Sequence, residues 1–307
     1  MRRPVRVVLI GLGKIARDQH CGALLRNPDF ELVCAVDPQV ASTQNLPVFP
    51  SIEALFSSKI EFDAAAVCTP PQIRKDICEK LFSNGCAVLL EKPPASDLAT
   101  ARSIGTAARK SGSVLFAAWH SRFSPHIDAA RDWVRANKVL SGSIEWRENV
   151  EEWHPGQTWL WQAGGLGVFD PGINALSILT EIFPADWQVR NAKVSVPLNA
   201  VAPDAADFCL HADDITVSAS FEFHQREDEI WRIQLVAANG ETLELSEGGA
   251  SLKLRDGAPN ILNVNEYDGV YRRFSDLIRA NQTDYDLAPM EIAENALLMG
   301  LSSNSSE

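Results

Sequence analysis

Two side chains in this sequence stand where they could accept or donate a proton in a reaction. Lys92 comes after the apolar run 86–90 and one glutamate. Asp170 stands at the expected start of a helix, with Asn174 one helical turn further on. An amine at the end of a buried strand can hydrogen-bond a hydroxyl group and share in its deprotonation. Asp170 precedes Pro171 and is also a good helix cap, and a capping carboxylate suits an orienting role better than that of a strong base. The residues alone leave both roles of this aspartate open.

A glycine-rich hexapeptide near the N-terminus has the G-x-G-x-x-A form of a dinucleotide site. It follows the apolar run 5–10 directly and opens a helical pattern. In that context the first glycine permits a tight turn, the second lets a pyrophosphate approach the backbone, and the alanine lets the helix pack on the strand. The free N–H groups at the helix start attract the anion. We therefore expect a dinucleotide to be held by Gly11, Gly13, Lys14 and Ile15.

The acidic residue at the end of the second expected strand predicts the type of dinucleotide. Asp37 could accept hydrogen bonds from both ribose hydroxyls of NAD but would repel the 2′-phosphate of NADP, and no arginine stands beside it. NAD is therefore the expected cofactor, with NADP as the weaker alternative. Other cofactor contacts are expected where further strands end, at Thr69, Pro70, Glu91 and His120. The first two of these fit equally well a strand end followed by the first turn of a helix.

The first 120 residues alternate short apolar runs with helical patterns, which is typical of a parallel sheet with helical crossovers. Strands are expected at 5–10, 31–36, 63–68, 86–91 and 113–118, and helices at 14–26, 51–57, 71–84 and 97–111. Asp97 should cap the last of these helices and Gly112 should end it. The pattern predicts an NAD-binding Rossmann domain over residues 1–121.

A different pattern follows residue 121, with hairpin-connected strands between helices. Helices are expected at 122–137, 171–182, 265–281 and 289–301, and strands at 143–149, 187–197, 207–212, 215–223, 229–238 and 241–246. Asn239-Gly240 between the last two strands predicts a type I′ hairpin turn. The predicted fold class is therefore α/β, with an N-terminal Rossmann parallel sheet plus a C-terminal α+β domain (residues 122–307) that has an open, mainly antiparallel sheet. An exposed sheet face of that size is commonly covered by another subunit, so we expect a homo-oligomer, such as a homodimer, formed through the C-terminal sheet.

Composition and charge exclude several classes of partner. The 307 residues are 46% hydrophobic and 22% charged, as in a globular protein, and the net charge of −12 excludes nucleic acid as an expected partner. No apolar run approaches the roughly 20 residues that span a bilayer, and the basic start of the chain is not followed by a signal-peptide pattern. The six cysteines form no C-x-x-C pair. We expect them to be buried thiols in a reducing compartment, the cytoplasm, and we expect no metal site.

Several longer motifs resemble the glucose–fructose oxidoreductase/inositol dehydrogenase/MocA family, and the chain looks most similar to the aldose 1-dehydrogenases within it. The motifs are 11–16, 13–20, 91–93, 119–122, 153–157 and 164–174. The resemblance implies hydride transfer to NAD from the anomeric C1 of an aldose, which is D-galactose and also D-fucose or L-arabinose, to give the aldonolactone.

The resemblance also implies roles for individual residues. Lys92 and Asp170 would contact the anomeric hydroxyl, and one of them would take its proton. The implied substrate-binding residues are Glu148, Trp153, His154, Asn174 and Trp231. Much of the wider family has a histidine at position 174, whereas the aldose subgroup is similar to this chain in carrying asparagine. Because asparagine cannot titrate, the proton chemistry moves onto Lys92 and Asp170. The family's Lys-Pro bond is often cis, so we expect Lys92–Pro93 to be cis as well.

The residues themselves support a sugar less specifically. A pyranose needs carboxylates, amides, histidine and tryptophan together, and residues 145–161 are rich in them, although an ordinary solvated strand and loop would fit too. A second hypothesis keeps the redox chemistry but makes the substrate inositol or another cyclic polyol. A third is a non-catalytic NAD-binding regulatory protein, against which the retention of Lys92 and Asp170 argues.

Overall fold

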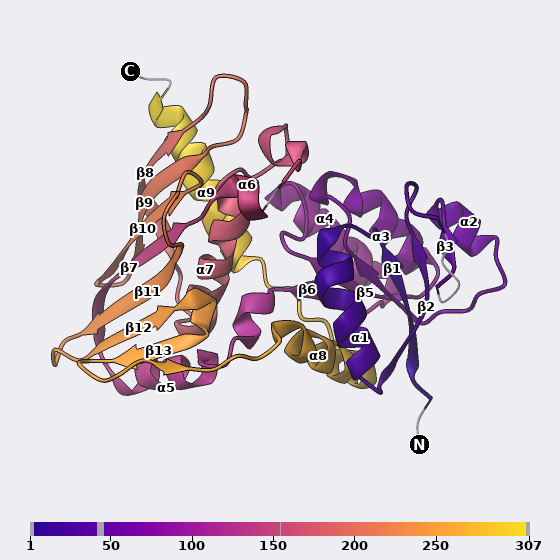
Figure 1. Cartoon of the computed structure of the whole chain (residues 1–307), viewed down its shortest axis with the longest axis horizontal. Coiled ribbons are helices and arrows are strands. Elements are labelled where there is room, and N and C mark those ends of the chain that lie inside the picture. The colour runs from indigo at the N-terminus through magenta and orange to yellow at the C-terminus, as the bar shows by residue number, and fades with distance from the viewer. Residues whose placement is uncertain (1–2, 42–45, 154, 305–307) are drawn as a thin grey trace. The chain divides into compact units, whose positions relative to one another are not determined.

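The computed structural model describes residues 3–41, 46–153 and 155–304 (Figure 1). Contacts divide the chain into two units, Met1–His120 with Asn265–Asp286, and Ser121–Val264 with Leu287–Glu307. The sequence-based boundary at residue 121 placed residues 265–286 in the second domain. The structure groups them with the first unit instead, because the backbone N–H of Ala117 donates to the carbonyl of Asp284 at 3.0 Å and the helix before it packs on the first unit.

The first unit holds a parallel sheet, which confirms the predicted Rossmann fold. In the described residues its strand order is β3-β2-β1-β4-β5-β6. The strands are β1 (Val5–Ile10), β2 (Phe30–Val36), β3 (Val48–Phe49), β4 (Ala64–Val67), β5 (Ala87–Glu91) and β6 (Leu115–Ala118). Every residue of β4, β5 and β6 is buried, so both faces of the sheet are covered, as expected for continuous apolar runs. Because all these strands are parallel, their carboxyl ends share one edge.

Helices cover this sheet, and the sequence predicted all of them, although it placed the last one, expected at 265–281, in the second domain. They are a π-helical turn η1 (Ala16–His20), α1 (Cys21–Arg26), α2 (Ile52–Phe56), η2 (Pro71–Ile73), α3 (Arg74–Ser83), α4 (Leu98–Ser111) and α8 (Glu266–Ala280). A short helix that was not predicted, η3 (His120–Phe123), begins at His120 and continues into the second unit. The carboxylate of Asp97 caps α4 by accepting from the N–H of Thr100 at 2.7 Å, and Gly112 ends it at a φ of 72°. Helix α8 packs against α1 and β6.

The second unit holds the predicted open sheet. Its order in the described residues is β14-β13-β12-β11-β7-β10-β9-β8, with β7 and β10 parallel and the other neighbours antiparallel. The strands are β7 (Val139–Arg147), β8 (Gln188–Ser195), β9 (Ala205–Ala212), β10 (Ile215–Glu222), β11 (Ile230–Ala237), β12 (Thr242–Ser246), β13 (Ser251–Leu254) and β14 (Asn260–Ile261). The other elements are α5 (Ile127–Ala136), α6 (Val150–Trp153), η4 (Thr158–Trp161), α7 (Phe169–Ile182), η5 (Glu247–Gly249) and α9 (Ala288–Asn304).

One face of this sheet is buried and the other is polar, because side chains alternate along each strand. In β10, Val217, Ala219 and Phe221 are buried. Helix α7 packs on β7 and β11, and Figure 1 shows it along the same sheet as α9. Helix α7 lies so close to strand β10 that position 172 requires a glycine, since a Cβ there would lie 2.4 Å from the ring of Phe221. Within the described residues no helix is both long and apolar enough to cross a membrane.

Two local predictions for the second unit are wrong. Asp170 is not the helix cap, because α7 already begins at Phe169 and Asp170 lies in its first turn. The hairpin at Asn239-Gly240 is present, but among the described residues only the glycine of this pair has a positive φ (79°), whereas a type I′ turn needs both. The short strands β3, β13 and β14 were not expected.

Candidate active site

The glycine turn of the first unit has the geometry that a dinucleotide needs. Gly11 has a φ of +91°, and a Cβ there would lie 3.1 Å from the backbone nitrogen of Thr69. A Cβ on Gly13 would meet no described atom within 4 Å. The first glycine is therefore required by its own conformation and by the close approach of β4, while the second leaves open space beside the helix start.

Polar groups around this space fit an NAD molecule. The hydroxyl oxygen of Thr69 is buried and has no hydrogen-bond partner among the described residues, so a bound ligand could supply one. Lys14 is exposed, and its amine pairs with Asp18 at 2.7 Å, four residues further along the helix. The helical segment begins at Lys14 and Ile15, and the residue before it, Gly13, has no side chain that could cap it. The N–H groups at this helix start are therefore available to a pyrophosphate.

Asp37 follows β2 and is bound to the glycine turn itself. One carboxylate oxygen accepts from the N–H of Leu12 at 2.8 Å, and the other accepts from the N–H of Gln39 at 2.8 Å. A carboxylate oxygen has more than one acceptor position, so these bonds leave capacity for ribose hydroxyls. The sequence did not predict that this carboxylate also fixes the turn.

Lys92 follows β5 on a segment that is fixed from two sides. The guanidinium of Arg74, itself 3% exposed, donates to the backbone carbonyls of Glu91 and Pro93, which flank the lysine, and to that of Thr69 at 2.8 Å. The Lys92–Pro93 peptide bond is cis, as expected. The lysine side chain is half-buried at the carboxyl edge of the sheet.

A buried polar network holds the other side of this segment. One oxygen of the Glu91 carboxylate lies 2.9 Å from Nε2 of His20 and accepts from the hydroxyl of Tyr267 at 2.6 Å. The other oxygen accepts from the backbone N–H of Lys92 at 2.9 Å. Nδ1 of His20 lies 2.7 Å from the hydroxyl of Tyr271. The four side chains of this Glu91 network (His20, Glu91, Tyr267 and Tyr271) are between 0% and 3% exposed.

The charges of the Glu91 network are set by its members together with the neighbouring side chains of Cys68 and His120. Burial alone would raise the pKa of Glu91, but hydrogen bonding and charge from His20, with Tyr267 and His120, bring it below its ordinary value. Burial alone would lower the pKa of His20, but the neighbouring Cys68 and Glu91 side chains raise it. Near neutral pH the network therefore holds a buried ion pair, in which the histidine ring donates to the carboxylate.

His120, a predicted cofactor contact, lies beside this network. Its Nδ1 pairs with the carboxylate of Glu266, and its ring stacks on Tyr267 with centroids 5.5 Å apart. The Glu91 side chain, predicted to contact the cofactor, is turned into the protein. Direct cofactor contacts by Glu91, His120, Thr69 and Pro70 remain predictions.

In the second unit, the end of β7 and the start of β11 bring acidic and aromatic side chains together. Glu148 directly follows β7 and is 4% exposed, and its N–H donates to the carbonyl of Glu222 at 3.0 Å. Trp231 stacks on Trp146 with ring centroids 6.0 Å apart. The ring of Trp153 packs against Trp231 in a tilted arrangement, with centroids 5.5 Å apart. His154 lies outside the described residues. The predicted residues Glu148, Trp153 and Trp231 thus belong to one region.

Glu229 also belongs to this region, although no sequence motif pointed to it. Its carboxylate accepts a hydrogen bond from the indole N–H of Trp153. Burial raises the pKa of Glu229, and so do the charges of Glu148 and Glu152, although the bond from Trp153 opposes the shift. The indole N–H of Trp231 is buried without a partner among the described residues. A polar ligand beside these indoles would satisfy that donor.

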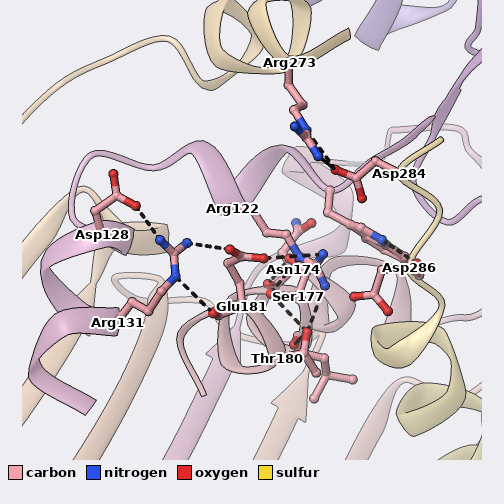
Figure 2. A network of polar contacts seen from close by, with 12 residues as sticks. Arg122, Asp128, Arg131, Asn174, Ser177, Thr180, Glu181, Arg273, Asp284 and Asp286 are labelled. Atoms are coloured by element: carbon pink, nitrogen blue, oxygen red, sulfur yellow. Dashed lines mark hydrogen bonds and ion pairs between the residues drawn. The ribbon is translucent and has the colours of Figure 1, made fainter. Parts of the chain in front are cut away.

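Asp170 and Asn174 lie on the first two turns of α7, and the far half of this helix is fixed by arginines (Figure 2). Arg122 donates to the carbonyl of Ser177 at 3.1 Å and to the hydroxyl of Thr180 at 3.0 Å. Arg131 joins Glu181 near the helix end to Asp128 of α5. Asp170 is buried and Asn174 is half-buried. Among the described residues, no group of His, Cys, Asp and Glu could hold a metal ion.

The ion pair of the Glu91 network predicts how stability depends on pH. The folded pKa of His20 is above its ordinary 6.5, so its contribution is complete below that pH and is lost as the pH rises. The folded pKa of Glu91 is below its ordinary 4.5, so its contribution is complete above 4.5 and is lost in acid. In Glu91→Gln the Tm should fall, by the equivalent of about 3–5 kcal/mol near pH 6, and should change less between about pH 6.5 and 9 than in the wild type. Calorimetry would contradict this if both proteins showed the same pH slope.

The fold and the first unit define a dinucleotide-dependent protein, and comparison with known proteins gives its family. Residues 5–119 match the oxidoreductase family with an NAD-binding Rossmann fold, known as GFO_IDH_MocA. The whole chain is similar to a galactose 1-dehydrogenase from Pseudomonas fluorescens, with 39% identity over 97% of this chain and 96% of that protein. The chain therefore belongs to this oxidoreductase family.

Solved structures agree with this. The crystal structure of a D-galactose-1-dehydrogenase from Rhizobium etli has a TM-score of 0.91 and 38% identity, covering 97% of this chain and 96% of that chain. An aldose-aldose oxidoreductase from Caulobacter crescentus has a TM-score of 0.84 at 17% identity, covering 98% of each chain, and shows the shared fold.

Proposed function

We propose that the protein is an NAD-dependent aldose 1-dehydrogenase that oxidises the anomeric C1 hydroxyl of D-galactose, and also of D-fucose and L-arabinose, to the aldonolactone. The observation that carries this proposal is the similarity, along nearly the whole chain, to galactose 1-dehydrogenases from two bacteria. The three sugars have the same ring stereochemistry from C2 to C4, so one set of hydroxyl-binding residues would serve all of them.

The chain's own residues would handle the proton and orient the sugar. NAD, when bound, supplies a hydride acceptor at C4 of its nicotinamide. As the C1–H bond breaks with its electron pair, the O–H bond of the same carbon must break too, and its proton goes to Lys92 or Asp170. The half-buried amine at the end of β5 and the carboxylate in the first turn of α7 are proposed to hydrogen-bond that oxygen.

The second unit would supply the rest of the sugar contacts. We propose Glu148, His154 and Asn174 as partners for ring hydroxyls, with Trp153 and Trp231 against the apolar C–H face of the ring. The buried carboxylate of Glu148 after β7 supports this assignment, and so does the indole N–H of Trp231, which has no hydrogen-bond partner among the described residues. Carboxylates and amides accept and donate hydrogen bonds as sugar hydroxyls require, while indole rings cover apolar surface.

The proposed activity predicts NADH formation by the wild-type protein with D-galactose, D-fucose and L-arabinose. Absorbance of the reduced nicotinamide follows the reaction directly. A higher kcat/KM with myo-inositol than with all three aldoses would instead make the protein a cyclic polyol dehydrogenase. Binding of NADH without turnover of any sugar or polyol would make it a non-catalytic binding protein, and either result would contradict the proposal.

A matched pair of lysine variants gives this assay its control. Lys92→Ala should lower kcat about 100-fold or more while the Kd of NADH stays within about twofold, because the amine acts on the proton and not on cofactor affinity. Lys59→Ala, which removes an exposed lysine of the same unit, should match the wild type. Equal kcat values for the two variants would remove Lys92 from the chemistry.

Asp37 predicts cofactor choice. Asp37→Ser should raise the ratio of kcat/KM for NADP to that for NAD by about tenfold or more, because the repulsion of a 2′-phosphate is lost. Asp37→Asn should shift the ratio in the same direction and keep an acceptor oxygen for the N–H of Leu12, which separates charge from the bracing of the turn. An unchanged ratio of the two kcat/KM values in both variants would show that the Asp37 carboxylate does not discriminate between NAD and NADP.

The open sheet of the second unit bears on the oligomeric state of the protein. We propose a homo-oligomer formed through the polar face of the eight-stranded sheet, where the short side chains of Ser218 and Ser220 alternate with buried residues, so that a second sheet could approach closely. Light scattering that gave the mass of one chain would contradict this.

We also propose a cytoplasmic location. All six cysteines lie in described ranges and are free thiols, which supports a reducing compartment such as the cytoplasm.

A further inference from the structure

The Glu91 network joins three parts of the chain that are far apart in sequence. His20 comes from the π-helical turn after the glycine motif, Glu91 ends β5, and Tyr267 and Tyr271 come from α8. Tyr267 and Glu91 are separated by 176 positions. Helix α8 thus reaches the residue that directly precedes Lys92, although it lies far outside the Rossmann sequence pattern.

We propose that Tyr267 is a positioning residue for Lys92, acting through the carboxylate of Glu91, and that Tyr271 assists through His20. This inference rests on the proposed function, because it assigns Lys92 to the reaction. It adds an element that the glycine motif and the Glu91-Lys92-Pro93 triplet do not contain, namely the first turns of α8.

The hydrogen bonds of Glu91 indicate that Tyr267 positions Lys92 and does more than fill space in the core. One oxygen of Glu91 receives the hydroxyl of Tyr267 and the ring of His20, and the other receives the backbone N–H of Lys92. The carboxylate therefore transmits its orientation to the backbone of the lysine. If one donor is removed, the buried carboxylate is under-satisfied and must move or rotate to recover a partner.

Burial keeps the hydroxyls of both tyrosines protonated. Burial raises the pKa of Tyr267 and of Tyr271, and the nearby charge of Glu91 raises them further. The Tyr267 hydroxyl therefore stays protonated near neutral pH and can donate to Glu91. It holds the carboxylate without itself exchanging a proton with the substrate.

The chain contains its own matched control, because it has three tyrosines. Tyr285 is the third, and its hydroxyl donates to the backbone carbonyl of Ala101 at 3.0 Å in the same unit. Tyr285→Phe and Tyr267→Phe each remove one largely buried hydroxyl and its hydrogen bond. Similar losses of Tm are expected for both, so that any difference in catalysis reports on Lys92.

The test compares Tyr267→Phe, Tyr271→Phe and Tyr285→Phe with the wild type. Tyr267→Phe should lower kcat about tenfold while the KM of NAD and the Kd of NADH stay within about twofold. Tyr271→Phe, one bond further from the carboxylate, should lower kcat about threefold, and Tyr285→Phe should change none of these values. Equal kcat in Tyr267→Phe and Tyr285→Phe would overturn the proposal.

A second readout does not depend on any sugar. Reductive methylation with formaldehyde, followed by mass spectrometry of the peptide that contains Lys92, should show a rate changed about threefold or more in Tyr267→Phe and unchanged in Tyr285→Phe. If the wild type turns over no aldose but methylation responds in this way, the proposed function is wrong and the positioning stands. If the wild type is active and neither kcat nor methylation distinguishes the two variants, the positioning is wrong.

Discussion

The first unit is organised around the buried carboxylate of Glu91, whose oxygens need hydrogen-bond donors and an opposite charge. The Glu91 side chain is 3% exposed, and a charge so deeply buried is tolerated only with an opposite charge and full hydrogen bonding. His20 supplies the charge, Tyr267 a hydroxyl, and Lys92 its backbone N–H. The requirement ties together the helix after the glycine turn, the end of β5 and the returning helix α8. Cofactor site and proposed catalytic lysine are thereby built on the same interaction.

The two units contribute different chemistry to the proposed reaction. The first offers open space beside Gly13, a carboxylate at Asp37 and the lysine at the edge of the sheet. The second offers a buried glutamate, a group of tryptophans and the polar first turns of α7. The arginines that fix the far half of α7 keep that helix in place, so the side chains on its first turns have a rigid support (Figure 2).

Much of this arrangement could be predicted from sequence because its signals are local. Strands buried on both faces are continuous apolar runs, and the glycine turn, the Asp97 cap and the Gly112 end each depend on a few neighbouring residues. The start of α7 was misplaced because Asp170 before a proline is a good cap locally, yet the buried residues Val168 and Phe169 already continue into the helix.

What was missed depends on contacts between distant residues. The pattern of residues 265–281 predicts a helix but not the unit on which it packs. Its pairing with the first unit, and with it the Glu91 network, becomes visible only in three dimensions. Glu229 was missed for the same reason, since its link to Trp153 spans two segments that no motif connects.

The central claim is that a hydride leaves C1 of an aldose for the nicotinamide while residues of this chain handle the proton. D-Galactose deuterated at C1 tests it most directly when the protein is incubated with NAD and the products are examined by mass spectrometry. The account predicts that the deuterium appears on the reduced nicotinamide and is absent from the lactone. Reduced nicotinamide that carries no deuterium, or none formed at all, would contradict it.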